Sequence, residues 1–573
     1  MYNNLAIRFE QFTGTYPRTD KPAISGVNLS VSSGECIGIV GPPGAGKTTF
    51  LRAINGTFQH FFKADYEGNV YVMGRSVSDT AVHEIARQVQ TVFQDVESQI
   101  VGITVESDLA FGMENLAIDT QEMIERVNTA LSWFGLTKYR SYSPYSLSGG
   151  EKQRLAIASG LICEPQVLLL DEPTAELDPE ARARLLDMLL ELKGRGVTLV
   201  VVEQNTDFLA QLVDRVIVLV DGQAVYDDTS KTIFGSPAKL DSLGIRPPQA
   251  SELALRLGMK EPTPITLAEL SAALGNMEVS VDVVPATTRQ AKQDMKPVIR
   301  FAEVSYRYPG RDVYALNDIS CEFFSGEVVA IAGRNGSGKS TMAKHMLALV
   351  KPTRGDVVVR DTNVKNVSPS DLAKFVGYVF QNPAYQISQE TVKDEILFGM
   401  RNAGIPEAMQ REKMYQICEQ LGINTDEKFM AQSPMLLSHG QRQLVVIASV
   451  LVMDPEIVIL DEPTTGLGYS EAKRLAHIID HLAHTEGRCV VLITHDMWFV
   501  GQLADKTLLL SEGRMLGYDR TWVVFKDTSL VKQAGLEPPY VTSALQNIWI
   551  SDSGNGRIPT SVSQIKPSTR GVS

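Results

Sequence analysis

Two short glycine-rich stretches of this sequence could hold a phosphate group. Residues 41–49 read GPPGAGKTT and residues 333–341 read GRNGSGKST, so each contains Gly-x-x-x-x-Gly-Lys-Ser/Thr. Glycine lets backbone N–H groups curl around a phosphate, the lysine neutralises its charge, and the hydroxyl can ligate Mg²⁺. The predicted nucleotide ligands are Gly41, Gly44, Gly46, Lys47, Thr48 and Thr49, and Gly333, Gly336, Gly338, Lys339, Ser340 and Thr341.

An acidic pair ends an apolar run in each half of the chain. Asp171-Glu172 follows VLLL, and Asp461-Glu462 follows IVIL. Beside a phosphate loop, the aspartate is predicted to hold Mg²⁺ together with Thr48 or Ser340. The glutamate is placed to orient or deprotonate a water molecule that attacks the terminal phosphate.

The spacing of these motifs shows that the chain is a tandem repeat. Gly41 and Gly333 lie 292 residues apart, and Asp171 and Asp461 lie 290 apart. Within each half, short apolar runs alternate with stretches of helical period, which predicts an α/β fold with a mostly parallel, doubly wound sheet. The predicted boundaries are 1–228 and 297–526 for two nucleotide-binding domains, 229–296 for a helical appendage and linker, and 527–573 for an appendage and a disordered tail.

Composition limits what the partners of this chain can be. The net charge of −13 weighs against nucleic acid, which wants a basic surface. The start, MYNNLAIRFE, lacks the basic and apolar parts of a signal peptide. The longest apolar stretch lies near residues 445–453, well below the ~20 residues of a membrane helix. We therefore expect a soluble protein whose membrane role, if any, comes through a partner.

Together with LSGGE at residues 147–151, these motifs resemble the nucleotide-binding domains of the ABC ATPase family. The resemblance implies two P-loop (RecA-like) domains, each with an antiparallel β subdomain and a helical subdomain. It also implies that Gln94 and Gln381 contact nucleotide and Mg²⁺, and that Tyr16 and Tyr308 stack on adenine. In this family the ATP bound by one domain is closed by the signature of the other. The implied signature residues are Ser148, Gly149, Gly150, Ser438, His439 and Gly440.

A finer resemblance concerns residues 93–116, which are similar to the same segment in ATPases of energy-coupling factor (ECF) importers. Those importers join two ATPase domains to a transmembrane coupling protein and a small substrate-capturing membrane protein, at the cytoplasmic face of the membrane. The resemblance implies ATP-driven uptake of a vitamin, a vitamin precursor or a metal ion, with docking near residues 99–115 and 386–402. The alternatives are another ABC importer subfamily, or a soluble tandem ABC ATPase acting on the ribosome or DNA. The near-neutral linker and the absence of CxxC pairs weigh against the second alternative.

The two halves differ at three places that the family uses for catalysis. The switch position holds His495 in one half and Gln204 in the other, and glutamine cannot carry a proton. The signature has His439 where the first half has Gly149, and Gly468 replaces Asp178. By the family's pairing, all three departures fall on the first P-loop's site, which predicts a degenerate site there and a competent one at the second. His439 could obstruct the phosphate or donate to it, and neutral drift is the third reading.

Overall fold

The computed structural model describes residues 4–17, 19, 21–175, 177, 179–274, 281–283, 296–334, 336–546 and 559–567, with backbone only at 281–283, 546 and 566–567. Asp178 lies outside these residues. The chain divides into two compact units. The first unit takes the residues up to 255 together with 259–270, and the second takes 256–258 and the residues from 271 onward. The first unit thus includes most of the predicted appendage.

The first unit contains a six-stranded sheet in the order β10-β9-β3-β8-β7-β6 and a four-stranded antiparallel sheet in the order β2-β1-β4-β5. The strands are β1 (Leu5–Thr15), β2 (Ile24–Ser32), β3 (Cys36–Val40), β4 (Asp65–Val72), β5 (Arg75–Ser76), β6 (Val89–Val92), β7 (Val167–Asp171), β8 (Thr198–Val202), β9 (Arg215–Val220) and β10 (Gln223–Thr229). The helices are α1 (Lys47–Ile54), α2 (Thr57–Phe61), α3 (Val82–Ile85), α4 (Val105–Asn115), α5 (Thr120–Trp133), α6 (Gly149–Leu161), α7 (Pro179–Gly194), α8 (Thr206–Leu212), α9 (Ser230–Phe234) and α10 (Pro237–Ser242). Helices α11 (Gln249–Arg256) and α12 (Leu267–Leu274) reach the division between the units.

The second unit repeats this architecture, with sheets in the orders β17-β18-β19-β14-β20-β21 and β13-β12-β15-β16. Its strands are β11 (Val281–Val283), β12 (Ile299–Tyr306), β13 (Leu316–Phe323), β14 (Val328–Ala332), β15 (Arg354–Val359), β16 (Thr362–Asn363), β17 (Val376–Val379), β18 (Ile457–Asp461), β19 (Cys489–Ile493), β20 (Lys506–Ser511), β21 (Arg514–Arg520) and β22 (Ile565–Pro567). Its helices are α13 (Lys339–Met346), α14 (Pro369–Leu372), α15 (Val392–Asn402), α16 (Glu407–Leu421), α17 (Glu427–Met430), α18 (His439–Leu451), α19 (Tyr469–Asp480), α20 (Met497–Leu503), α21 (Thr521–Lys526), α22 (Thr528–Gln533) and α23 (Tyr540–Gln546).

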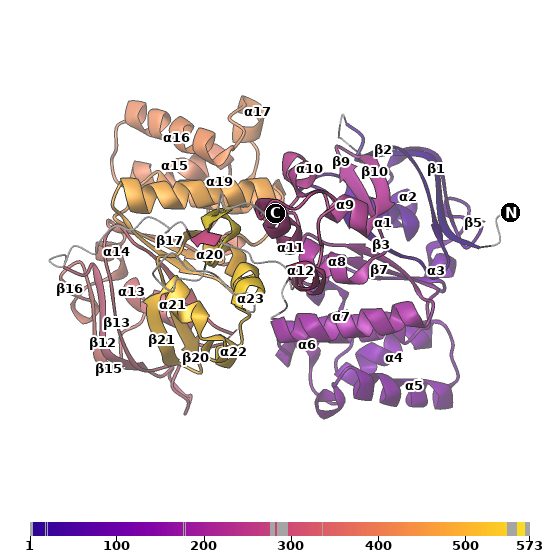
Figure 1. Ribbon diagram of the computed structural model, residues 1–573, viewed down its shortest axis with the longest axis horizontal. Coiled ribbons are helices and arrows are strands. Elements are labelled where there is room, and N and C mark those ends of the chain that lie inside the picture. The colour runs from indigo at the N-terminus through magenta and orange to yellow at the C-terminus, as the bar shows by residue number, and fades with distance from the viewer. Residues whose placement is uncertain are drawn as a thin grey trace. The chain divides into compact units, whose positions relative to one another are not determined.

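The central strands are apolar because both faces of each six-stranded sheet are covered. In β7, Val167 and Leu169 pack into the core shared with α1, whereas Leu168 and Leu170 pack into the core shared with α4 and α6. Strands β6, β7, β8, β3 and β9 run parallel, so their carboxyl ends meet at one edge. In the second unit, α15, α16 and α17 gather at one end, away from the antiparallel sheet of β12, β13, β15 and β16 (Figure 1). The doubly wound α/β fold and both subdomains of each half are as predicted.

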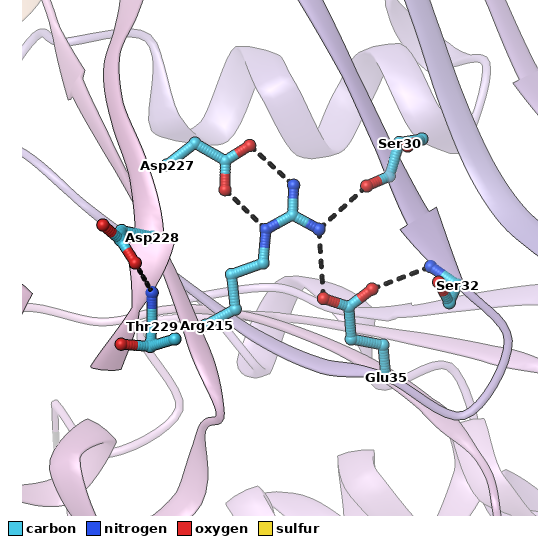
Figure 2. Close-up of polar contacts among 7 residues, drawn as sticks. All are labelled: Ser30, Ser32, Glu35, Arg215, Asp227, Asp228 and Thr229. Atoms are coloured by element: carbon cyan, nitrogen blue, oxygen red, sulfur yellow. Dashed lines mark hydrogen bonds and ion pairs between the residues drawn. The ribbon is translucent and has the colours of Figure 1, made fainter. Parts of the chain in front are cut away.

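Arg215 joins the two sheets of the first unit (Figure 2). At the start of β9, its Nη1 donates to the backbone oxygen of Ser30 at 3.0 Å and to Glu35 Oε1 at 3.0 Å. Its Nε and Nη2 grip both carboxylate oxygens of Asp227 in β10. Glu35 in turn accepts from the Ser32 backbone N–H at 2.8 Å. One guanidinium therefore links the antiparallel sheet, the turn before β3 and strand β10 at the edge of the six-stranded sheet.

Residues 559–567 differ from the disorder that the tail's composition predicts. Their strand β22 pairs with β11, and the Thr560 hydroxyl donates to the backbone oxygen of Gly501 at 2.9 Å. Val562 and Ile565 are buried. Two buried apolar side chains and one hydroxyl donor help to hold this short segment in place. The average composition of the polar tail does not reveal them. The rest of the polar tail lies outside the described residues.

Candidate nucleotide sites

The first glycine-rich stretch forms a tight loop between β3 and α1. Gly46 has φ of 93°, and a Cβ there would lie 2.3 Å from the backbone oxygen of Ala23, so only glycine fits. Lys47 opens α1 and folds back over the loop. Its Nζ donates to the backbone oxygens of Gly41 at 2.8 Å and Pro42 at 3.0 Å. The ammonium is thereby held at the loop whose N–H groups would cradle a phosphate.

The second loop, between β14 and α13, has the same construction. Gly338 has φ of 111°, with the Ala315 backbone oxygen 2.6 Å from where a Cβ would be. Lys339 Nζ donates to the backbone oxygens of Gly333 at 2.7 Å and Arg334 at 2.9 Å. Further left-handed glycines in the two loops are Gly44 (φ 77°) and Gly336 (φ 80°).

In each unit the hydroxyl and the aspartate of the predicted magnesium set come together, whereas Gln94 bonds Glu172 and Gln381, among the described residues, bonds neither. Asp171, at the end of β7, accepts a hydrogen bond from Thr48, and Asp461, at the end of β18, accepts one from Ser340. Burial raises the pKa of each aspartate to about 6. In the second unit, Tyr378 Oη also donates to Asp461 at 2.9 Å. A hydroxyl and a carboxylate side by side beside a phosphate loop fit Mg²⁺, which takes few protein oxygens and completes its shell with water and phosphate.

Glu172 is held by two amides in the first unit. Gln94 Nε2 donates to Glu172 Oε2 at 2.9 Å, and Gln204 Nε2 donates to Glu172 Oε1 at 2.6 Å. Glu172 has φ of 48°, a backbone conformation that non-glycine residues adopt at a cost and that is common at functional sites. Both carboxylate oxygens thus accept hydrogen bonds from neutral amides. An amide cannot take up a proton from the glutamate.

Glu462 has the same φ of 48° but different partners. Its Oε1 lies 2.7 Å from His495 Nδ1, and its Oε2 accepts from the Thr494 hydroxyl at 2.9 Å. Burial opposes ionisation, because Glu462 is only 5% exposed, but His495 and then Thr494 outweigh it and lower the pKa of Glu462. Gln381, the counterpart of Gln94, is exposed, and within the described residues no hydrogen bond of its side chain is found. The structure therefore brings Glu462 and His495 together and leaves Gln381 apart.

The sequence analysis missed the residue before each switch position. In the second unit this is Thr494, whereas in the first it is Glu203, only 3% exposed. Glu203 Oε2 accepts from the Thr174 backbone N–H at 3.1 Å and hydroxyl at 2.7 Å. Its Oε1 accepts from the backbone N–H groups of Gln204 at 2.8 Å and Asn205 at 3.0 Å. The signal that could have found Glu203 is the exchange of threonine for an acid between two otherwise matched halves.

Both tyrosines predicted to stack on adenine lie near the helix that follows the P-loop. Tyr16 Oη is 3.3 Å from Thr49 Oγ1, and Tyr308 Oη is 3.2 Å from Thr341 Oγ1. Arg52 donates to Tyr16 Oη at 3.0 Å. Each phenol is therefore tied to the first turn of α1 or α13, and the role of its ring toward a base stays a prediction.

The two signatures open helices α6 and α18, as expected. Ser148 and Ser438 are the N-cap residues, and both are exposed. The Ser148 backbone N–H donates to Glu151 Oε2 at 2.9 Å, and the Ser438 backbone N–H donates to Gln441 Oε1 at 3.1 Å. The caps fix both helix starts in a form that leaves the serine hydroxyls at the surface.

His439 faces a loop of its own unit. A Cβ on Gly466, whose φ is 75°, would lie 2.3 Å from His439 Nδ1, so the imidazole occupies the space that glycine leaves. Nδ1 is buried, and it has no hydrogen-bond partner among the described residues. Burial and then the Arg442 cation lower the pKa of His439, which favours the neutral ring. His439 and Gly466 therefore form a matched large–small pair. Glu176, the counterpart of Gly466, lies outside the described residues.

Comparison with known proteins identifies the class. The family model described as "ABC transporter" matches residues 24–175 and 316–465. A protein of Caldanaerobacter subterraneus subsp. tengcongensis that bears the name ABC transporter ATP-binding protein is 35% identical over 533 residues, covering 91% of this chain and 93% of that protein. One from Methanosarcina mazei is 33% identical over 549 residues, covering 93% and 92%. A solved chain described as ribosome-bound archaeal Pelota and ABCE1 is 18% identical with a TM-score of 0.61, covering 91% of this chain and 80% of that chain, which shows the fold alone.

The chain belongs to the ABC transporter family and is a tandem ABC ATPase that binds and hydrolyses ATP. Each unit carries its own P-loop, acidic strand end and signature. Among the described residues, no helix is long and apolar enough to span a membrane.

Proposed function

We propose that this chain is the energy-coupling subunit of an ECF-type importer, working with separate membrane proteins at the cytoplasmic face. ATP and Mg²⁺ bind at each P-loop, and the cycle of binding and hydrolysis drives the partner. When bound, Mg²⁺ would supply charge neutralisation at the phosphates. The proposal draws on the resemblance of residues 93–116 to ECF ATPases and on relatives named as transporter ATP-binding proteins.

The observation that carries the partner proposal is a pair of exposed apolar patches, one on each unit. In the first unit, Ile103 is 86% exposed and Phe111, on α4, is 47% exposed. In the second, Tyr385 is 84% exposed and Phe398, on α15, is 43% exposed. Phe111 and Phe398 are counterparts in FGMEN and FGMRN. Phe111 and Phe398, exposed at matching places, favour a protein partner that contacts both units.

The same helices also have core faces, so exposure decides which side chains are free to dock. Val105, Leu109 and Met113 of α4 are buried in the core of the first unit. The corresponding core positions of α15 are Val392, Ile396 and Met400. The predicted docking surface is therefore reduced to the outward residues of 99–115 and 386–402.

We also propose unequal sites. On the family's head-to-tail pairing, the second P-loop is closed by Ser148, Gly149 and Gly150, and turnover is concentrated there. The first P-loop is closed by Ser438, His439 and Gly440, and it mainly retains nucleotide. The difference between Glu462, paired with His495, and Glu172, held by two amides, supports this assignment.

Affinity purification from membranes tests the transport role. Membrane proteins should co-purify with the native chain, and Phe111→Asp with Phe398→Asp should remove them while ATP binding is retained. Leu190→Asp is the matched control, because Leu190 is also exposed, at 39%, but lies on α7. Co-purification of ribosomes in place of membrane proteins would overturn the proposal.

A further inference from the structure

Glu203 is a buried carboxylate that no step of ATP hydrolysis requires. It follows β8, between the strand that leads to the P-loop and the strand that ends in Asp171. Its two oxygens accept four hydrogen bonds, from Thr174, Gln204 and Asn205. Burying a carboxylate costs free energy unless its oxygens are hydrogen-bonded. The donors around Glu203 in the first unit offset that cost.

The four bonds tie together two loops that flank Glu172. Thr174 lies two residues beyond Glu172, and Gln204 itself donates to Glu172 Oε1 at 2.6 Å. Two separate links therefore join the end of β7 to the end of β8. One is the bond of Glu203 with Thr174, and the other is the bond of Gln204 with Glu172. They close a small ring of hydrogen bonds that links the two loops.

Among the described residues of the second unit, no such ring is found. Thr494 and His495 both bond to Glu462, so both links from the end of β19 go to the catalytic carboxylate. Thr464, the counterpart of Thr174, is half-buried, whereas Thr174 is 4% exposed. In the first unit the end of β8 bonds both Glu172 and Thr174, whereas in the second unit the end of β19 bonds the glutamate.

We propose that Glu203 is a positioning residue that anchors the loop after Glu172 to the switch loop, and that this anchor slows nucleotide release from the first unit. The inference deepens the proposed retention of nucleotide at the first P-loop and rests on it. Threonine at this position, as in the second unit, cannot reach Thr174 and the switch backbone together. Without the anchor, the loops beside the bound phosphates open more easily and the nucleotide escapes sooner.

The test measures release of fluorescent N-methylanthraniloyl-ATP with Mg²⁺ from the isolated full chain. In a Lys339→Ala background, which disables the second P-loop, Glu203→Thr should speed release about tenfold or more, and Thr174→Val, which removes one hydroxyl donor, should speed it less. In a Lys47→Ala background, which reports on the second unit, Glu203→Thr should change release by less than about twofold.

Asp108→Asn is the matched control, because Asp108 is also a buried carboxylate of the first unit and accepts from the backbone N–H groups of Val101 and Gly102. It should leave release unchanged. Unchanged release in folded Glu203→Thr, or equal acceleration by Asp108→Asn, would overturn the proposal. If Glu203→Thr does not fold, Thr174→Val decides, and unchanged release in that variant also overturns it. No membrane partner is used, so failure here is separate from failure of the transport role.

Discussion

The glutamates that follow β7 and β18 in the two units share one backbone conformation and differ in what holds them. Glu172 and Glu462 both have φ of 48°, so the strand end aims the two carboxylates alike. The first is held by the amides of Gln94 and Gln204, and the second by Thr494 and His495. Only the second has an imidazole neighbour, whose ring can carry an added proton, whereas an amide cannot. A repeated fold can thus keep its geometry and change its chemistry through the side chains around one residue.

The strongest test of this difference is to replace each glutamate by glutamine in turn. Glu462→Gln should lower steady-state ATP hydrolysis by roughly 10²–10⁴-fold, the usual weight of a general base, with ATP binding retained. Glu172→Gln should have a much smaller effect, because its site turns over slowly already. Phosphate release and nucleotide binding are measured on both variants. If Glu462→Gln keeps more than half the activity and Glu172→Gln removes it, the two sites are assigned the wrong way round.

A second difference between the units depends on pH. His484 lies between Asp480 and Asp505, at 2.8 and 3.0 Å, and mainly its bond to Asp505 raises its pKa to about 9. The corresponding place in the first unit has Lys193, which bonds Asp214 at 2.8 Å. A histidine pKa raised above its unfolded value of about 6.5 contributes stability that is complete below that pH and is lost as pH rises through 9.

We expect the second unit, and not the first, to lose roughly 1–3 kcal/mol of unfolding free energy between pH 6.5 and 10. Urea unfolding followed by hydrogen exchange, which separates the units, measures this loss. His484→Gln should remove the pH dependence, and His477→Gln, which changes another histidine of the same helical segment, is the control. A loss of equal size in the first unit would contradict the assignment.

A smaller effect concerns His439 and Gly466. Gly466→Ala places a Cβ 2.3 Å from the imidazole at a left-handed backbone position, and it should cost about 1–3 kcal/mol of stability. In a His439→Gly background the clash is absent, so the cost should fall to the backbone part, about 1 kcal/mol. Denaturant unfolding of both single variants and the double variant gives the coupling. Strictly additive costs would mean that the two residues are not a pair.

These outcomes bear on why the signature glycine was replaced. The neutral ring of His439 is turned to Gly466, which weighs against a cationic phosphate ligand. His439→Gly, alone and with Gln204→His, measured with Glu462→Gln present, separates the three readings. Higher hydrolysis in the double variant indicates obstruction, weaker nucleotide retention with no higher hydrolysis in His439→Gly indicates a phosphate ligand, and unchanged hydrolysis and retention indicate drift.

The sequence was sufficient for the fold and for the ligands that local spacing fixes. The P-loops, Asp171 and Asp461 lie where strand ends and glycine turns put them, because each depends on neighbours a few residues away. Gln94 and Gln381 occupy matching motif positions, yet only Gln94 bonds its glutamate, because Thr494 and His495 already occupy both oxygens of Glu462.

The exchange of Thr494 for Glu203 is visible in the sequence, but the bonds of Glu203 could not be predicted, because its four donors come from two loops brought together only by the sheet. An acid at a strand end is otherwise read as a solvated side chain. The ordered part of the tail escaped prediction for a related reason, since β22 pairs with β11, nearly three hundred residues earlier in the chain.

The joint that Arg215 makes concentrates its side-chain links in one residue. In the second unit two separate residues make the corresponding links. Lys506 Nζ bonds Glu327 at 2.8 Å, and Tyr518 Oη donates to the Glu322 backbone oxygen at 2.6 Å. Loss of either bond there leaves the other in place. In the first unit one guanidinium makes the side-chain links to Ser30, Glu35 and Asp227, so loss of Arg215 removes them together and this joint is the more fragile of the two.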